Sequence, residues 1–259
     1  MRILILGDVI GASGMRAVVS ALRGLIRQYR ADFVVVNGEN ADDGFGINHA
    51  LAEQLFKAGA DVITTGNHVW HHEDVGTLLD NNPAVLRPDN YPGGAPGSGV
   101  SLTEGKAGRV AVVNLQGRDR MPTIECPFRR AREILKRLRG KTDAIIVDFH
   151  AESTHEKEAL AFYLDGEVSV VYGTHTHVQT ADHRILPKGT AYITDIGASG
   201  PDDSVIGFDP QISIRRVLTQ LPLKNEVAPG AATLHGLVVQ TGDAGTANAV
   251  DSIAFRSLI

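Results

Sequence analysis

RILILGD (residues 2–8) is an aliphatic run that stops at a carboxylate, Asp8. Four later stretches repeat this pattern: FVVVNGEN (33–40), DVITTGNH (61–68), DAIIVDFH (143–150) and VSVVYGTHTH (168–177). Short runs rich in Val and Ile are typical of strands buried in a parallel sheet. Ligands of open α/β sheets bind outside the carboxyl ends of the strands, so these five polar ends predict one active site.

Amphipathic segments separate the runs. Residues 14–30 place Met15, Val18, Leu22 and Leu25 on one face at helical spacing. Further segments of this kind lie near 48–58, 71–80, 127–139 and 154–164. Strands alternating with helices indicate βαβ units and a largely parallel sheet.

The remaining segments complete the predicted fold. The Pro- and Gly-rich stretch 83–99 is predicted to be a loop, because the strand-like VAVVNL (110–115) follows it. LHGLVVQT (234–241) and VDSIAFRSL (250–258) predict two antiparallel strands joined by a Gly-rich turn. We therefore expect an α/β fold with mixed sheets, formed as a single domain over residues 1–259.

Composition excludes several classes of protein. Cys126 is the only cysteine, so an intramolecular disulfide and a thiolate metal cluster are excluded, and any metal needs nitrogen and oxygen ligands. A net charge of −5 and a pI near 6.0 argue against a partner such as long nucleic acid. No apolar stretch is long enough for a membrane span and no signal peptide is recognisable, so we expect a cytoplasmic protein without a membrane partner.

The motif GTHTH carries the strongest metal signal. His175 and His177 stand at i and i+2, so on a strand end they point to one side and can reach adjacent metals. His150 follows another buried strand and strengthens this interpretation. The alternative is a polar turn with two hydrogen-bonded histidines.

Acidic and amide side chains complete the predicted set. Asp8 and Glu39 supply anionic oxygens, although each alone could equally cap a turn. Asn67 can offer a neutral oxygen to a hard cation or cap a helix. His68 beside it is suited to donate a proton to a leaving group.

Two competing interpretations are weaker. GDVIGASG (7–14) has the spacing G-x-x-x-G-x-x-G, not the dinucleotide-binding G-x-G-x-x-G, and a nicotinamide site would leave the strand-end histidines unexplained. Six other histidines lack the strand-end setting and are predicted to be structural or solvated. His71 and His72 are the possible exceptions, because with Trp70 they could line the pocket; the other four are His49, His155, His183 and His235.

Several motifs, in this order, resemble the calcineurin-like metallophosphoesterases: GEN, GNH, DFHAE and GTHTH. With GDVIG, VNGENADDGFGI and TDIGASGPDDSVIG (194–207), the chain more closely resembles the bacterial YmdB-like branch of that superfamily. The resemblance covers most of the chain and implies an αββα sandwich. It also implies a hydrolase of phosphodiesters.

The resemblance implies a dinuclear centre. The usual first motif is D-x-H, but Ile10 stands where that histidine is expected, and Asn40 is implied to fill the gap. The implied ligands of one metal are Asp8, Glu39, Asn40 and His177, and those of the other are Glu39, Asn67, His150 and His175. Such nitrogen and oxygen ligands suit iron or manganese, with magnesium possible.

The implied reaction is attack of a metal-bridged hydroxide on a small phosphodiester, with His68 as general acid. The expected substrates are 2′,3′-cyclic and 3′,5′-cyclic nucleotides, and Phe45, Trp70 and Tyr91 could offer a stacking surface. The alternatives are a phosphomonoesterase and a cyclic-nucleotide-binding regulatory protein with little turnover. The sequence leaves open whether the chain forms a homo-oligomer.

Overall fold

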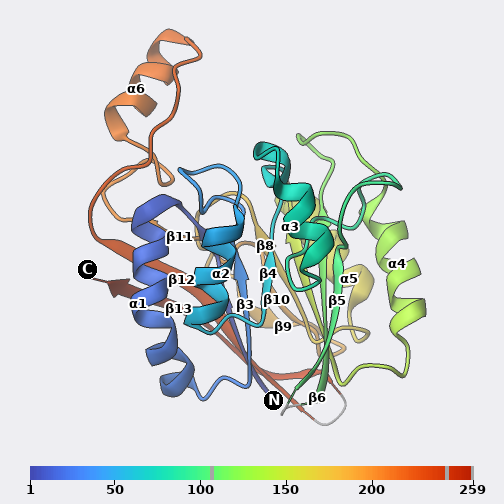
Figure 1. Cartoon of the computed structure of the whole chain (residues 1–259). Coiled ribbons are helices and arrows are strands. Elements are labelled where there is room, and N and C mark those ends of the chain that lie inside the picture. Colours follow the sequence, from blue (N-terminus) through green and yellow to red (C-terminus); the bar gives the residue numbers. More distant parts are fainter. Residues whose placement is uncertain (106–107, 243–244, 258–259) are drawn as a thin grey trace.

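The structure is a computed structural model that describes residues 1–105, 108–242 and 245–257. Two sheets face each other between two layers of helices (Figure 1). The first sheet has the order β2-β11-β12-β1-β3-β4, and β13 pairs with β12. Its strands are β1 (Arg2–Leu6), β2 (Asp8–Val9), β3 (Phe33–Asn37), β4 (Val62–Thr64), β11 (Ala198–Pro201), β12 (Ala232–Thr241) and β13 (Ala247–Ser257).

The second sheet has the order β5-β6-β7-β8-β10-β9. From β6 to β10 its neighbours are parallel, whereas β5 and β9 are antiparallel edge strands. Its strands are β5 (Val100–Gly105), β6 (Gly108–Gln116), β7 (Ala144–His150), β8 (Val170–Thr174), β9 (Arg184–Ile185) and β10 (Ala191–Ile193).

Burial on both faces explains why the central strands are uniformly aliphatic. In β1, Ile3 and Ile5 pack between the sheets, whereas Leu4 and Leu6 pack in the cluster that includes the helices of the first layer. Successive side chains of a strand point to opposite faces, so a strand covered on both sides has no polar face. These helices are α1 (Gly11–Tyr29), α2 (His49–Ala58) and α3 (Val75–Asn81).

The helices α4 (Pro127–Leu138) and α5 (Thr154–Leu164) cover the outer face of the second sheet. They confirm the segments predicted near 127–139 and 154–164. The prediction of one helix near 71–80 is wrong at its start, because a short 3-10 turn (Val69–His71) precedes α3. Residues 67 and 68 of the GNH motif form a turn before it.

The C-terminal prediction is confirmed for its described residues. β12 and β13 pair antiparallel from Ala232↔Ser257 to Thr241↔Ala247; residue 258, which the prediction included, lies outside the described residues. Residues 83–99 contain no named strand or helix, as expected for a loop.

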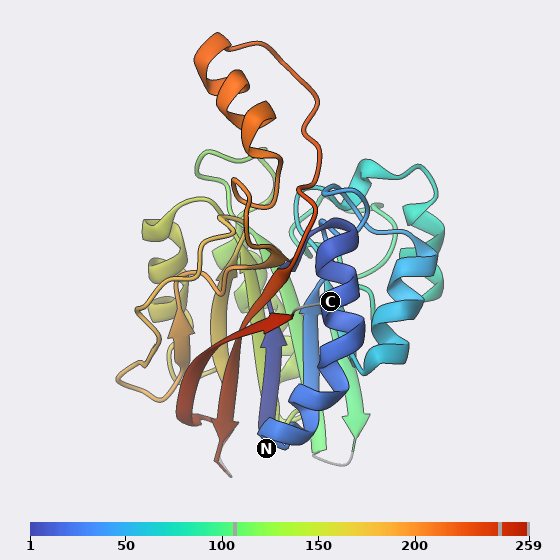
Figure 2. The same ribbon diagram turned by 90° about the vertical axis from the view of Figure 1, so that its left-hand side faces the viewer.

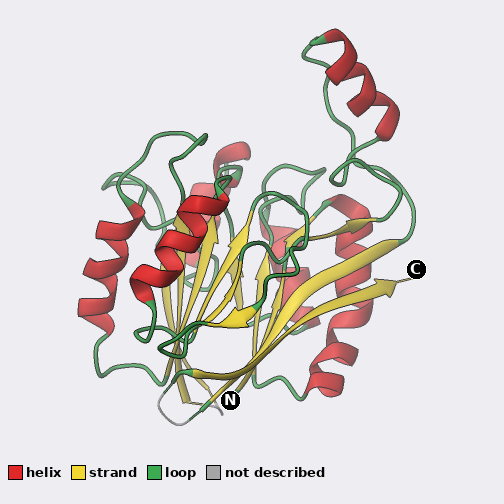
Figure 3. Cartoon of the chain, turned by 180° about the vertical axis from the view of Figure 1, so that it is seen from behind, coloured by secondary structure: helices red, strands yellow, loops and turns green. Residues whose placement is uncertain are grey.

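The strands β5, β9, β10 and β11 were not predicted, and neither was one helix. The helix α6 (Pro210–Thr219) stands away from the rest of the chain on an arm between Phe208 and Val227 (Figures 2 and 3). It contains no buried residue, and its N-cap Asp209 accepts a hydrogen bond from the backbone of Ile212. Across the described residues, no helix combines the length and apolar character needed to cross a membrane.

Candidate metal centre

The eight predicted side chains lie in one contact network at the carboxyl ends of the strands. The first sheet supplies Asp8 from β2, the residues that follow β3 and those that follow β4. The second sheet supplies the last residue of β7 and the loop after β8. The members are Asp8, Glu39, Asn40, Asn67, His68, His150, His175 and His177.

One half of the network surrounds Nε2 of His150. This atom lies 2.9 Å from Oδ1 of Asn67, 3.1 Å from Nδ1 of His175 and 3.2 Å from Oε1 of Glu39. Ligand atoms of Glu39, His150 and His175 all lie within 4.8 Å of one another. Glu39 and His150 are fully buried.

In each imidazole ring, the hydrogen bond made by the outer nitrogen decides whether the nitrogen that faces the site carries a proton or a lone pair. Thr174 donates its hydroxyl to Asp148 at 2.8 Å, so it accepts from Nδ1 of His150 at 2.9 Å. Nε2 of His175 lies 3.3 Å from a carboxylate oxygen of Glu152, which can only accept. The facing atoms, Nε2 of His150 and Nδ1 of His175, therefore both carry lone pairs.

Lone pairs that face one another at such distances repel unless a cation lies among them. The acceptor oxygens of Glu39 and Asn67 point at the same place, so the donor set fits a divalent metal held by nitrogen and oxygen. Thr174 and Glu152, which contact the outer nitrogens of the two rings, fix the tautomers of His150 and His175. Hydrogen bonds of this kind commonly orient metal-binding histidines.

The other half of the network joins Asp8, Asn40 and His177. Nε2 of His177 lies 3.4 Å from Oδ2 of Asp8 and 3.1 Å from Nδ2 of Asn40. Nδ1 of His177 donates to the carbonyl of Ile206 at 2.9 Å. Oδ1 of Asp8 is buried without a hydrogen-bond partner among the described residues, which a second cation would correct.

Three histidines of the network differ in the direction of their pKa shifts. Burial lowers the pKa of His150 and of His175 to about 4, so both rings are neutral and able to ligate at neutral pH. Burial also opposes protonation of His177, but the contact with Asp8 outweighs it and raises the pKa of His177 to about 9.

His68 lies beside Asn40, with Nδ1 2.7 Å from Oδ1 of that amide. Its side chain is 29% exposed, and Phe45 packs edge-on against the ring at 5.0 Å. Burial lowers the pKa of His68, while the charge of Glu39 opposes the shift. His68 therefore sits at the solvent side of the site, where a leaving group can reach it.

Four of the other histidines lie outside the contact network. His71 stacks on Phe45 at 5.5 Å and His72 pairs with Asp42 at 3.0 Å, so both lie next to the site without joining the ligand network. His49 is exposed and lies 3.7 Å from Glu53, and His235 contacts the carbonyl of Ala198.

The backbone adopts uncommon conformations around the predicted ligands. His175 and His177 both have positive φ, 99° and 66°. Left-handed backbone at a non-Gly residue costs about 1–3 kcal/mol and persists only where the surroundings enforce it. Gly66 has no room for a side chain, because a Cβ would lie 2.2 Å from Oε2 of Glu39.

The residue at position 10 belongs to the hydrophobic core and contributes no side chain to the site. Ile10 is fully buried, and a Cβ on Gly207 or on Gly200 would come within 2.6 and 3.0 Å of it. Asn40 stands beside His177, and its replacement of the missing histidine stays a prediction.

Sequence reasoning missed four contributors: Asp148, Glu152, Thr174 and the Ile206 carbonyl. Asp148 and Glu152 belong to the quoted stretches around DFHAE, so their closeness to His150 in the sequence could have predicted that they support the site. The carbonyl of Ile206 is 29 residues from His177, and nothing in the sequence marks it.

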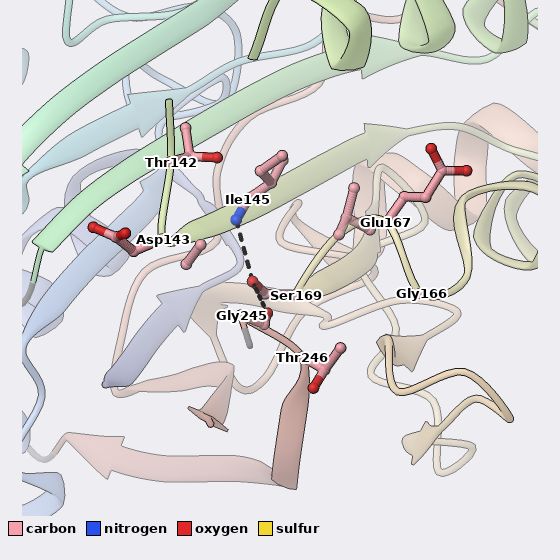
Figure 4. A pocket seen from close by; sticks show the side chains of 10 residues that line it. Thr142, Asp143, Ile145, Gly166, Glu167, Ser169, Gly245 and Thr246 are labelled. Carbon is pink, nitrogen blue, oxygen red and sulfur yellow. Dashed lines mark hydrogen bonds between the residues drawn. The ribbon is translucent and has the colours of Figure 1, made fainter. Parts of the chain in front are cut away.

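A separate hollow of about 90 Å³ lies at the amino ends of β7 and β8 (Figure 4). There Ser169 accepts from the backbone of Ile145 and donates to the carbonyl of Gly245. Because His150 is the last residue of β7 and Ile145 is its second, this hollow is at the far edge of the sheet from the metal-type side chains. The candidate metal centre is therefore identified by its nitrogen and oxygen side chains and not by the presence of a hollow.

A model of the YmdB-like protein family matches residues 4–253. A 2′,3′-cyclic-nucleotide 2′-phosphodiesterase of Bacillus subtilis is 45% identical over 243 residues, covering 94% of this chain and 92% of that protein. A hypothetical protein from Thermus thermophilus has a TM-score of 0.93 with 40% identity and 99% coverage of both chains. A structure described as a novel phosphatase from Mycoplasma pneumoniae has a TM-score of 0.92 with 35% identity, covering 99% and 93%.

The αββα sandwich and the site at its strand ends define a metallophosphoesterase, a metal-dependent phosphoric diester hydrolase that uses divalent metal ions. Within that class the chain belongs to the YmdB-like family. The predicted fold class and family resemblance are thereby confirmed.

Proposed function

We propose that this enzyme hydrolyses 2′,3′-cyclic nucleotides at a centre of two metal ions, iron or manganese. The observation that carries the proposal is the convergence of unprotonated ring nitrogens with the oxygens of Glu39 and Asn67. The substrate class comes from the Bacillus subtilis relative, whose name gives cleavage of the 2′ ester bond.

The two halves of the network would hold one metal each. Asp8, Asn40 and His177 would hold the first, Asn67, His150 and His175 the second, and Glu39 would belong to both. Metal ions in such sites act as Lewis acids toward phosphoryl oxygens and lower the pKa of water. Glu39 suits the shared position, since its Oε1 lies 3.2 Å from Nε2 of His150 and also accepts from Nδ2 of Asn40 at 3.3 Å.

His68 would serve as the proton donor. Hydrolysis adds water to phosphorus and breaks its bond to the 2′ oxygen, which needs a proton to leave as a hydroxyl. An anionic phosphodiester close to the ring would favour the protonated imidazole and so counteract the effect of burial on its pKa. The product would be the 3′-phosphate.

Turnover of four substrates tests the proposal. With Mn²⁺ added, 2′,3′-cyclic AMP should be converted to 3′-AMP, and bis-p-nitrophenyl phosphate should be cleaved faster than p-nitrophenyl phosphate. Conversion of 3′,5′-cyclic AMP would extend the substrate range. Preference for the monoester would instead establish a phosphomonoesterase, an alternative favoured by the phosphatase description of the Mycoplasma pneumoniae structure.

The role of His68 is tested separately from metal binding. His68→Ala should lower turnover by about 10²–10⁴-fold while elemental analysis still finds two metal equivalents. His49→Ala, at an exposed histidine on α2, is the matched control and should leave both values unchanged. Loss of metal from the His68 variant would make His68 a ligand and refute the assignment.

A single domain over residues 1–259 stays a prediction.

A further inference from the structure

The segment after β10 holds a buried carboxylate with an unusual set of donors. Oδ2 of Asp195 accepts from Nζ of Lys157 at 2.8 Å, from Oγ1 of Thr176 at 2.8 Å and from the backbone N–H of Thr176 at 3.1 Å. Oδ1 accepts from the backbone of Gly197 at 2.8 Å. The side chains of Lys157 and Asp195 are each 1% exposed. A buried ion pair of this kind is weak evidence for stability alone, so its place in the fold needs another explanation.

Thr176 separates the two imidazoles of the GTHTH motif. It therefore stands between His175 and His177, whose left-handed backbone must be enforced by the surroundings. Asp195 holds Thr176 by both its main chain and its side chain, and this is the only residue whose backbone lies between the two ligands.

Backbone contacts extend the same attachment on both sides of Thr176. Ile196 donates to the carbonyl of Gly173 at 3.0 Å, and Ala198 donates to the carbonyl of His177 at 3.2 Å. The approach at Gly173 is close, because a Cβ there would lie 1.8 Å from the carbonyl oxygen of Thr194. The 194–198 segment therefore follows the histidine loop along its length.

We propose that Asp195, itself fixed by Lys157, is a positioning residue that holds Thr176 and thereby aims His175 toward one metal and His177 toward the other. The inference rests on the proposed metal centre and assigns a role to the TDIGASG motif. Asp195 lies behind the loop and acts on the metals only through Thr176.

Metal affinity of the full chain tests this role without relying on activity. Loss of a contact behind a metal ligand typically lowers metal affinity by roughly 10–100-fold. Thr176→Val and Asp195→Asn should both weaken Mn²⁺ binding in this range, measured by calorimetry on metal-free protein. Thr176→Ser keeps the hydroxyl and should restore wild-type affinity.

Thr190→Val is the matched control. Thr190 is a buried threonine whose hydroxyl donates to the carbonyl of Val168, just before β8, at the edge of the sheet opposite the metal site. Its loss should lower the melting temperature without changing metal affinity. If Asp195→Asn does not fold, the comparison of Thr176→Val with Thr176→Ser decides.

The two possible failures are distinguishable. Wild-type protein that binds no Mn²⁺ would overturn the proposed metal centre itself. Wild-type protein that binds two equivalents, together with a folded Thr176→Val variant of equal affinity, would overturn the role of Asp195 and leave the centre intact.

Discussion

The side-chain nitrogen of Asn40 lies 3.1 Å from Nε2 of His177. The oxygen of the same amide faces His68. Turning the amide over would exchange two atoms of nearly equal size and point the oxygen at the proposed first metal. The nitrogen would then donate to Nδ1 of His68, leaving the proton of that ring on Nε2. Asn40 thus connects a proposed ligand with the proposed general acid.

Replacing Asn40 tests whether it fills the position left by Ile10. Asn40→Ala should lower the metal content below two equivalents and reduce turnover, because both a ligand and the neighbour of His68 are lost. Asn40→Asp retains an oxygen ligand and should keep the second equivalent. Elemental analysis after dialysis makes the comparison, and an Ala variant with full metal content and turnover would contradict the assignment.

Gly66→Ala should empty the centre while the sandwich remains folded. The added methyl would lie 2.3 Å from Nε2 of His150 and still closer to Glu39, so both side chains must move. We expect loss of bound metal with an unchanged circular dichroism spectrum. Gly24→Ala in α1 is the control, since a Cβ at Gly24 meets nothing within 4 Å and alanine favours a helix. Retention of two equivalents by the Gly66 variant would refute the arrangement.

Metal uptake should release a proton from His177. A metal-bound imidazole is unprotonated on the ligating nitrogen, whereas metal-free His177 has a pKa of about 9 and is charged at pH 7. His150 and His175 have pKa values of about 4 and lose no proton. Apparent affinity should therefore increase as the pH rises toward about 9.

Calorimetry in two buffers of different ionisation enthalpy counts this proton. In the metal-free protein, rising pH has the opposite effect, because it lowers the stability of the fold. The folded pKa of His177 lies above its usual value of 6.5, so its contribution is present below that value and is lost as the pH rises through about 9. Metal uptake at pH 7 without proton release would disagree with the pairing of His177 and Asp8.

The α6 arm should be dispensable for folding. Asp209 donates its backbone N–H to the carbonyl of Glu226 at 2.8 Å, so a short Gly/Ser linker can replace residues 210–223. Because α6 buries no residue, the free energy of unfolding in urea should change by less than about 1 kcal/mol. Leu22→Ala, on the buried face of α1, should cost about 2–5 kcal/mol in the same assay. A comparable loss on removing the arm would show that it contributes to the core.

Local patterns in the sequence were sufficient for the central strands and for most of the side chains that converge at the site. Each proposed ligand follows an aliphatic run, and a parallel strand covered on both faces is recognisable in the sequence by such a run. The pattern did not reveal that Asp8 and His177 come from different sheets, because pairing between distant strands leaves no local trace. The contact from the Ile206 carbonyl was equally hidden, since every residue has a carbonyl. The arm was missed although Asp209 and Pro210 carry a helix-start signal.

The division of the proposed ligands between two sheets has a thermodynamic consequence. Residues 8–68 bring one side of the centre and residues 150–177 the other, so each bound ion would tie together two regions far apart in the chain. An ion that binds the folded chain and not the unfolded one adds RT ln(1 + [L]/Kd) to the stability, about 2.7 kcal/mol at a hundredfold excess over Kd. Metal supply would then govern the lifetime of the folded enzyme as well as its turnover, and starvation for metal would expose it to proteolysis.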